Sequence, residues 1–246
     1  MGSSYLFIRD MISVCMATYN GEKFLRQQID SILRQLSMED ELVISDDGST
    51  DGTLDIIRGY ADSRIKLYCN TQVKGVNGNF ENALRHSKGD YIFLSDQDDV
   101  WLEGKVKGCV EGLQNADCVV HDCMVVDTDL NVVKESFFTE RKSGGGFWKN
   151  LYKNSYLGCC IAFRREMLEY ALPYPHPLPV FQEGWIASLS AIKGSVIFLP
   201  FKGILYRRHD NNASSTSGKS DFSLKKKITY RMQLLYKLLL RLMKIR

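Results

Sequence analysis

Residues 91–99 read Tyr-Ile-Phe-Leu-Ser-Asp-Gln-Asp-Asp, an apolar run that ends in a cluster of acids. The apolar part has the length of a buried strand. The three carboxylates that follow repel one another unless a cation lies among them. Carboxylate and diphosphate oxygens are the hard ligands that Mg²⁺ or Mn²⁺ prefers. The stretch therefore predicts a strand that ends in a site for Mn²⁺ or Mg²⁺.

Apolar runs of strand length alternate with segments of helical spacing throughout the first half of the chain. This alternation implies right-handed crossovers and a mostly parallel, Rossmann-like α/β sheet flanked by helices. Ligands of such sheets bind beyond the carboxyl ends of the strands. The predicted strands are 12–17, 42–45, 65–68 and 91–94, and the predicted helices are 22–36, 53–60, 79–87 and 104–113.

Polar residues follow three of these strands directly. Thr18 and Tyr19 follow the first strand, Asp46 and Asp47 follow the second, and the acids within 96–99 follow the fourth. The segment 45–52 suits a tight turn and a helix cap, but two carboxylates exceed what a cap needs. We expect one of them to accept the imide N–H of a pyrimidine base. The later Asp-Thr-Asp at 127–129 is explained by turn chemistry alone and is not a metal site.

The second half of the chain is less regular. Strands are expected at 118–126, 159–163 and 196–199, and a helix at 183–192. We expect one domain over 1–220, with halves of about 1–115 and 116–220, followed by a separate helix over 221–246.

Composition places the chain among folded cytoplasmic proteins. It has 246 residues, 44% hydrophobic and 25% charged, enough for one α/β domain with a full core. Seven cysteines without metal-binding spacing indicate reduced, mostly buried thiols. We see no signal peptide and no run of about 18 apolar residues.

The C-terminal segment 222–246 is basic and amphipathic. From residue 221 onward there are eight Lys or Arg and one Asp, which leaves a net charge of −4 for the rest of the chain. Ile228, Met232, Leu235, Leu239 and Leu242 share one predicted face. Such a helix either lies on the inner face of a membrane or packs on the protein's own core, and periodicity does not separate the two. Few aromatics and an acidic body argue against nucleic-acid binding.

Three blocks in the first half resemble a known family. Residues 17–22 read Ala-Thr-Tyr-Asn-Gly-Glu, residues 45–51 read Ser-Asp-Asp-Gly-Ser-Thr-Asp, and residues 95–101 read Ser-Asp-Gln-Asp-Asp-Val-Trp. In this order they resemble the signature blocks of the family 2 inverting glycosyltransferases, which have the GT-A fold. The third block, with residues 75–83, is similar to bacterial rhamnosyltransferase-like members that use dTDP-rhamnose.

The resemblance implies a role for each matching residue. Asp98 would bind the metal that bridges the donor's diphosphate, and Asp99 would lie beside it. The first half would bind the nucleotide sugar and the second half the acceptor. The implied nucleotide-sugar-binding residues are Thr18, Tyr19, Glu22, Asp46, Asp47, Asn79, Asp96 and Gln97.

The second half matches the family more loosely. Family members often carry His-Asp-x-Trp with the Asp as general base, whereas residues 182–185 read Gln-Glu-Gly-Trp. Glu183 would then be the base, unless it is only a first-turn acid favoured by the helix dipole. Residues 205–212 resemble the family's Tyr-Arg-x-His-x-Asn ending, which implies His209 as a metal ligand and Arg207 at the phosphates. Trp101 and Trp185 would stack on sugars or pack in the core.

The sequence thus predicts a metal-dependent inverting glycosyltransferase. Its donor would be dTDP-rhamnose or a UDP-sugar. Its acceptor would be a hydroxyl of a cell-surface polysaccharide or lipid-linked glycan precursor. Two alternatives stay open. The altered Gln182-Glu183 pair fits a non-catalytic nucleotide-sugar-binding protein. A nucleotidyltransferase shares the scaffold type but normally has a Gly-rich phosphate loop, which is missing after the first strand, as is a dinucleotide fingerprint.

Overall fold

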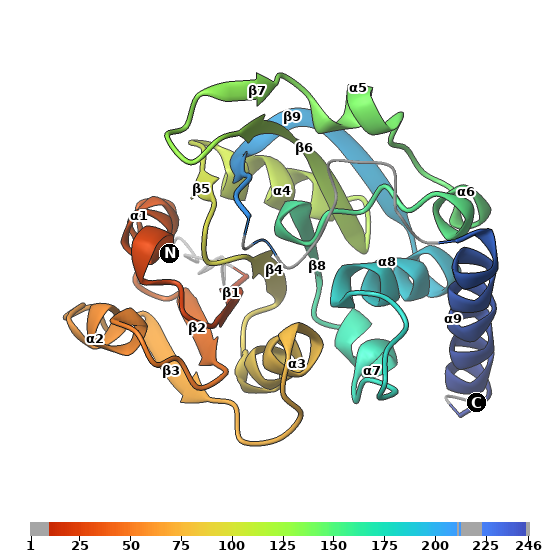
Figure 1. The fold of residues 1–246 in the computed structure, drawn as a ribbon, viewed down its shortest axis with the longest axis horizontal. Helices are drawn as coiled ribbons and strands as arrows, with labels where there is room; N and C mark the ends of the chain where they lie inside the picture. The colour runs from red at the N-terminus through yellow and green to blue at the C-terminus, as the bar shows by residue number, and fades with distance from the viewer. Residues whose placement is uncertain (1–9, 211, 213–222, 245–246) are drawn as a thin grey trace, which may run out of the picture.

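The alternating first half folds into four parallel strands joined by helices. In this computed structural model, which describes residues 10–210, 212 and 223–244, these strands lie in the order β3-β2-β1-β4 (Figure 1). Residues of β1, β2 and β4 are buried on both faces, so they read as continuous apolar runs. The elements are β1 (Ile12–Thr18), α1 (Glu22–Leu33), β2 (Glu41–Asp46), α2 (Thr53–Arg58), β3 (Ile65–Cys69), α3 (Val76–His86) and β4 (Tyr91–Ser95).

The second half continues the same sheet beyond β4. The order is β4-β8-β6-β9-β5, and β7 pairs with β6. The strands β5, β7 and β8 are antiparallel to their neighbours, and the others share one direction, so the prediction of a mostly parallel α/β sheet is confirmed. These strands are β5 (Val100–Trp101), β6 (Cys118–Val126), β7 (Val132–Lys134), β8 (Ile161–Arg164) and β9 (Val196–Arg207).

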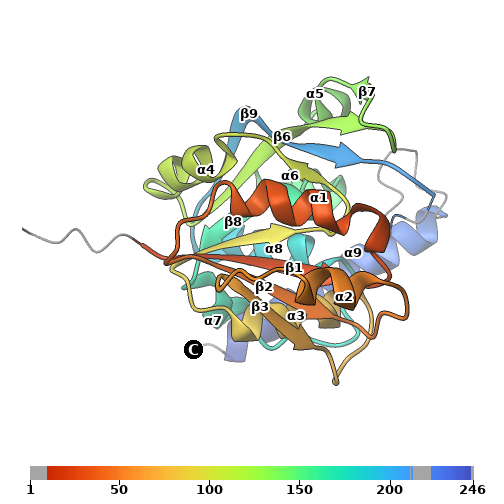
Figure 2. The same cartoon turned by 90° about the vertical axis from the view of Figure 1, so that its left-hand side faces the viewer.

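Helices cover both faces of this sheet. The connections to β2 and β3 run in one direction along the sheet and the connection to β4 runs back, so right-handed crossovers put α1 and α3 on opposite faces (Figure 2). A 3₁₀ turn, η1 (Gly158–Cys160), precedes β8. The other helices are α4 (Lys105–Leu113), α5 (Phe137–Arg141), α6 (Phe147–Tyr152), α7 (Met167–Ala171) and α8 (Gln182–Lys193).

The predicted C-terminal helix is present as α9 (Leu224–Lys244), and it lies at the edge of the molecule beside α7 and α8 (Figure 1). Residues 221–222 and 245–246 of the predicted helix lie outside the described residues. Among the described residues, no helix combines the length and apolar composition that crossing a bilayer requires. Six of the seven cysteines are buried and Cys69 is exposed, as expected for mostly buried thiols.

Candidate active site

The turn after β2 is built around the carboxylate of Asp46. Its Oδ1 accepts the backbone N–H groups of Gly48 and Ser49, both at 2.9 Å, and its Oδ2 accepts the hydroxyls of Thr18 and Ser49. Asp46 is only 1% exposed. These bonds give Asp46 a turn-forming role, and its bond to a pyrimidine stays a prediction.

Other predicted donor-binding residues also tie neighbouring loops together. Glu22 accepts the backbone N–H of Gly52 at 2.6 Å, which joins the start of α1 to the start of α2. The Asn79 amide accepts from the Ser45 hydroxyl at 2.6 Å and donates to the Thr18 carbonyl at 3.0 Å. The strand ends are therefore held in one rigid arrangement.

Asp47, in contrast to Asp46, faces the loop before α3. Its carboxylate accepts from the Asn70 amide and from the Gly75 backbone N–H, both at 2.8 Å, and Lys74 Nζ lies 3.5 Å from it. These bonds fix the approach to α3.

Gln97 locks the loop after β4 to the loop after β1. Its side-chain amide accepts from the Tyr19 N–H at 2.9 Å and donates to the Tyr19 carbonyl at 3.0 Å. The same amide covers Gly21, where an added Cβ would lie 2.3 Å from Gln97 Oε1. The Tyr19 side chain stays 56% exposed at the strand ends, where it is accessible to a ligand.

Asp98 and His209 meet although they are far apart in the sequence. His209 Nε2 lies 2.8 Å from Asp98 Oδ2, and the Asn212 amide donates to the same oxygen at 3.2 Å. The His209 ring packs on Phe24, with 5.1 Å between ring centroids. The structure thus brings the two predicted metal ligands together.

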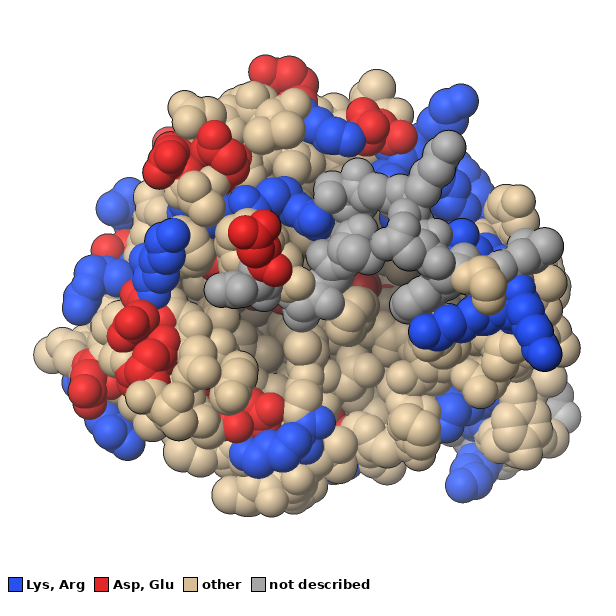
Figure 3. All heavy atoms as spheres, viewed as in Figure 1, with Lys and Arg blue, Asp and Glu red and all other residues tan. Residues whose placement is uncertain are grey.

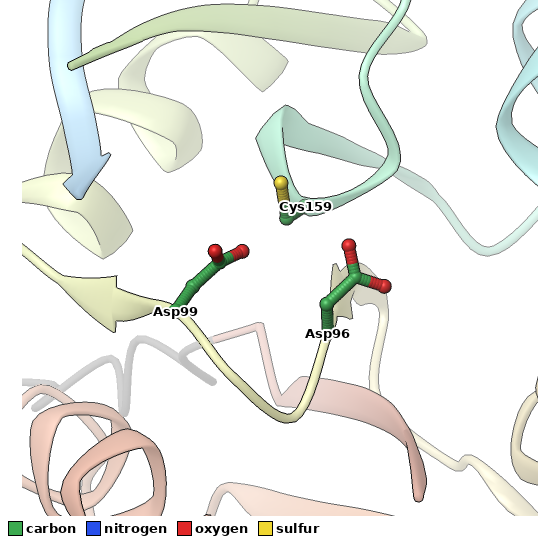
Figure 4. A group of neighbouring side chains, drawn as sticks. All are labelled: Asp96, Asp99 and Cys159. Carbon is green, nitrogen blue, oxygen red and sulfur yellow. The ribbon is translucent and has the colours of Figure 1, made fainter. Parts of the chain in front are cut away.

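Asp96 and Asp99 form a second acidic group with Cys159, which sequence reasoning missed. The three side chains converge, with ligand atoms within 4.8 Å of one another (Figure 4). Burial, and then the charge of Asp98, raises the pKa of Asp96 to about 7. Burial and the charges of Asp98 and Asp96 raise the pKa of Asp99 well above its usual range. Asp99 Oδ2 is buried and has no hydrogen-bond partner among the described residues, so this side of the cluster is poised to gain a proton or a cation.

Arg207 braces the acidic loop from the end of β9. Its backbone N–H donates to Asp99 Oδ1 at 2.9 Å. Its guanidinium donates to the carbonyls of Asp98 and Thr128 and to Gln27 Oε1, at 2.8, 2.5 and 2.6 Å. The residue is 2% exposed. Contact with the donor's phosphates stays a prediction, whereas its bonds fix the position of the loop.

Lys105 is a second functional candidate that the sequence did not reveal. It is fully buried, its Nζ donates to the Cys159 carbonyl at 2.7 Å, and it lies 3.8 Å over the Trp101 ring. Burial lowers its pKa. The cation holds η1 close to the acid cluster, but a lysine in a predicted helix gives no local sign of such burial.

Glu183 approaches the acid cluster from the other half of the chain. It lies in the first turn of α8, is 8% exposed, and sits beside η1, where a Cβ on Gly158 would lie 3.4 Å from Glu183 Oε2. Burial raises its pKa to about 8, and the charge of Asp96 adds to the rise. A carboxylate that resists losing its proton in this position has the character of a proton acceptor matched to neutral pH.

The two tryptophans near the site pack in the core and do not stack on a ligand surface. Trp185 is fully buried, and its indole N–H donates to the Ala171 carbonyl at 3.0 Å. Trp101 is 4% exposed beneath Lys105. Residues 127–129 form the turn between β6 and β7, where Asp127 accepts backbone N–H groups of Asp129 and Asn131, as expected.

The arrangement agrees with a family model. The model described as "Glycosyl transferase family 2" matches residues 13–171. The chain belongs to glycosyl transferase family 2. Its match covers the sheet from β1 to β8, with the acid cluster and η1, and leaves Glu183 and His209 outside.

Curated relatives of this glycosyltransferase carry related activities in their names. It is 28% identical over 213 residues to the UDP-Glc:alpha-D-GlcNAc-diphosphoundecaprenol beta-1,3-glucosyltransferase WfgD of Escherichia coli, covering 85% of this chain and 81% of that protein. It is 38% identical over 112 residues to the dTDP-rhamnosyl transferase RfbG of Shigella flexneri, covering 42% of this chain and 39% of that protein. A rhamnosyltransferase is therefore among its relatives.

Solved structures confirm the GT-A fold. The S. aureus TarS 1–349 complex with UDP-GlcNAc superposes with a TM-score of 0.68 at 18% identity, covering 92% of this chain and 72% of that one. The mannosyltransferase PcManGT from Pyrobaculum calidifontis, in complex with GDP-Man and Mn²⁺, has a TM-score of 0.63 at 19% identity, covering 97% and 65%. At these identities the likeness shows the fold alone.

The candidate metal ligands of this glycosyltransferase fit a divalent metal of the kind that the fold implies. Asp98 and His209 supply a carboxylate and an imidazole 2.8 Å apart, and the buried Asp99 Oδ2, which has no hydrogen-bond partner in the described part of the chain, would gain from positive charge nearby. Carboxylate oxygens suit Mn²⁺ or Mg²⁺, whereas the thiol of Cys159 suits softer metals. Asp98 and His209 are thus the better pair to hold the ion.

Proposed function

We propose that this chain transfers a sugar from a nucleotide-diphosphate donor to an acceptor hydroxyl, with inversion and with a divalent metal. The observation that carries the proposal is the position of Glu183, which lies on α8 beside η1 and is close enough to Asp96 for that charge to raise its pKa. Both carboxyl groups have pKa values raised by burial, to about 8 and about 7. Interacting carboxyl groups with raised pKa values, one of which follows a strand, are typical of acid–base chemistry.

Glu183 acts as the general base in this proposal. An alcohol has a pKa far above 7, so its proton must leave as the oxygen attacks the anomeric carbon. A positioned base contributes about 10²–10⁴-fold to such a step. Attack on the face opposite the departing diphosphate, in a single displacement, inverts the anomeric centre.

The loop that carries Asp98 would stabilise the departing diphosphate. Asp98 and His209 would hold the metal, and the metal, when bound, would neutralise negative charge on the departing diphosphate. Arg207 and Gln97 keep the loop in place, through the Asp98 carbonyl at 2.8 Å and the Tyr19 backbone at 2.9 and 3.0 Å. Tyr19 presents its exposed ring to the nucleotide base.

We further propose dTDP-rhamnose or a UDP-sugar as donor, and a cell-surface polysaccharide or lipid-linked glycan precursor as acceptor. Two relatives support these donor classes, because one is named for UDP-Glc and the other for dTDP-rhamnosyl transfer. The name of WfgD also includes a diphosphoundecaprenol-linked acceptor.

Nucleotide release tests the proposal. The chain is incubated with Mn²⁺ and either UDP-sugars or dTDP-rhamnose, and free nucleoside diphosphate is measured with and without a lipid-linked acceptor. We expect metal-dependent release that the acceptor accelerates. Metal-dependent binding without release would indicate a non-catalytic binder. Formation of pyrophosphate from a nucleoside triphosphate and a sugar phosphate would indicate a nucleotidyltransferase.

A further inference from the structure

The C-terminal helix α9 is attached to the body partly through its basic side chains. Arg231 donates to the Leu151 carbonyl at 3.1 Å, Lys237 to the Pro175 carbonyl at 3.1 Å, and Arg241 to the Leu172 carbonyl at 2.8 Å. Leu234 and Leu238, between them on the same face, are buried at 6% and 2% exposure. Basic side chains of this amphipathic helix therefore help to hold it on the protein.

The opposite face of α9 presents a continuous apolar stripe. Its five members are spaced by three or four residues, so they lie on one side of the helix. Each is at least half exposed. Ordinary monomers expose large apolar side chains singly, and a contiguous patch marks an interaction surface. The stripe consists of Ile228 at 50%, Met232 at 61%, Tyr236 at 62%, Leu239 at 59% and Met243 at 64% exposure.

Exposed aromatic and basic residues extend this surface onto α6. Trp148 and Tyr152 are each 73% exposed, and the Arg231 guanidinium lies 5.0 Å over the Tyr152 ring, so α6 adjoins α9. Lysines near the stripe and on α6 are exposed as well, namely Lys149, Lys153, Lys225, Lys226 and Lys244.

The α6 and α9 segments of this edge carry positive charge alone. The sequence has no Asp or Glu at 141–165 or at 223–246, the two segments that contain α6 and α9. In Figure 3 the edge on the α9 side, at the right, shows Lys and Arg but no Asp or Glu. The stripe is thus an apolar surface framed by cations.

We propose that the stripe on α9, with Trp148 and Tyr152 of α6, docks the protein on an anionic lipid bilayer. Apolar side chains of a surface helix enter the boundary between headgroups and acyl chains, aromatic rings favour the same level, and lysines pair with anionic headgroups. Since no described helix is suited to cross a membrane, α9 lies in the plane of the bilayer surface.

Charge favours lipid over a second copy of this chain as the occupant. A twofold-symmetric dimer brings identical patches together, so the cations that frame the stripe would face the same cations on the partner. An anionic bilayer instead neutralises all of them.

Sedimentation with lipid vesicles tests this docking surface. The purified chain is mixed with vesicles of phosphatidylglycerol and phosphatidylcholine, and with vesicles of phosphatidylcholine alone, without any nucleotide sugar. We expect binding to the anionic vesicles that weakens at high salt. Met232→Gln combined with Leu239→Gln should lower the partition coefficient at least about tenfold, because both side chains are lost from the apolar phase.

Met38→Gln is the matched control, because Met38 is 67% exposed on the loop after α1, and α1 and α9 lie at opposite sides of the molecule in Figure 1. A second variant, Lys225→Gln with Lys244→Gln, should reduce binding and its salt dependence. Equal vesicle binding by the stripe variant and the control would overturn the proposal. So would a dimer in lipid-free solution that the stripe variant converts to a monomer. Neither readout depends on sugar transfer, so failure here is distinguishable from failure of the proposed enzymatic function.

Discussion

The loops after β1 and β2 differ from the contact between the two halves of the chain in how their carboxyl groups are hydrogen-bonded. In the loops, the carboxylates of Asp46 and Glu22 accept hydrogen bonds from backbone N–H groups, and Asp46 also accepts from two hydroxyls. At the contact, Asp99 has an oxygen without a partner among the described residues, and burial raises the pKa of Glu183 to about 8. The hydrogen bonds in the loops hold them in place, whereas the carboxyl groups at the contact would gain from a nearby proton or cation.

This difference separates residues that shape a site from residues that act in it. A carboxylate that already accepts several hydrogen bonds has little left to offer a substrate, whereas a buried carboxylate without partners gains from a proton or a cation. Matching motifs in the sequence contain both kinds. Hydrogen bonding in the structure distinguishes them, and each prediction below tests that distinction.

Glu183→Gln should have the largest effect. Removing a general base should lower kcat by about 10²–10⁴-fold. In the original protein, kcat/KM should rise roughly tenfold per pH unit up to about pH 8 and then level off, because the free enzyme must lose the Glu183 proton. The variant should lose this rise, as measured by pH–rate profiles.

The matched control for that variant is Glu169→Gln. Glu169 is also a first-turn helix acid, on α7, and it is exposed. Similar small effects of both substitutions would show that Glu183 only complements the dipole of its helix.

Arg207→Lys should weaken metal binding without removing the charge. Lysine lacks the planar fork that joins the Asp98 carbonyl to Thr128 and Gln27. Residues that orient metal ligands affect metal affinity by about 10–100-fold, and we expect a loss of that size for Mn²⁺ by calorimetric titration. Arg208→Lys, at the next position, serves as control. Unchanged Mn²⁺ affinity with weaker metal-free nucleotide binding would instead indicate direct phosphate contact.

Glu183→Gln should also stabilise the protein, and increasingly so as pH rises. The folded-state pKa of Glu183, about 8, lies above the ordinary 4.5. The unfolded chain therefore releases this proton first, and the stability that protonated Glu183 provides is lost between about 4.5 and about 8. We expect the variant to gain about 1–3 kcal/mol in free energy of unfolding over this window, measured by urea denaturation. A loss of stability at pH 8 would contradict the destabilising effect of burial on the Glu183 carboxylate.

Gly21→Ala should have the smallest effect and tests the rigid region. The new Cβ would displace the Gln97 amide, which lies 2.3 Å away, from its bonds to Tyr19. We expect nucleotide affinity to fall roughly tenfold, about the effect of two lost hydrogen bonds. Adding Gln97→Ala should remove the clash, and Gly145→Ala is a control because its Cβ meets nothing within 4 Å. Unchanged nucleotide affinity in Gly21→Ala would show that the Gln97 lock is not needed for binding.

The spacing of apolar residues in the sequence predicts most of the strands and helices in the first half of the chain. The strands β1 to β4 and helices α1 to α4 are each long enough for their apolar period to be visible, and only their ends shift by a few residues. The two-residue β5 and the five-residue α5 and α7 were not predicted, because such short elements form through tertiary contacts. The strand β9 extends past 199 to Arg207, although Pro200 and Lys202 interrupt its apolar run.

The candidate site could be predicted only where a motif marked it. Asp98 and His209 were identified through motifs although 111 positions separate them. Cys159 and Lys105 carry no such sign, since one looks like a strand thiol and the other like a solvated helix lysine. Periodicity likewise placed Ile228, Met232 and Leu239 on one face of α9, but the side that contacts the body depends on α6, α7 and α8.

Anomalous scattering from crystals grown with Mn²⁺ and a nucleoside diphosphate would test the central claim most directly. The account predicts a manganese peak bonded to Asp98 and His209, with the hydrogen-bonded contact between these two side chains opened to admit it. A structure in which the nucleotide is bound while His209 still contacts Asp98 at 2.8 Å, with no manganese beside either, would contradict the account.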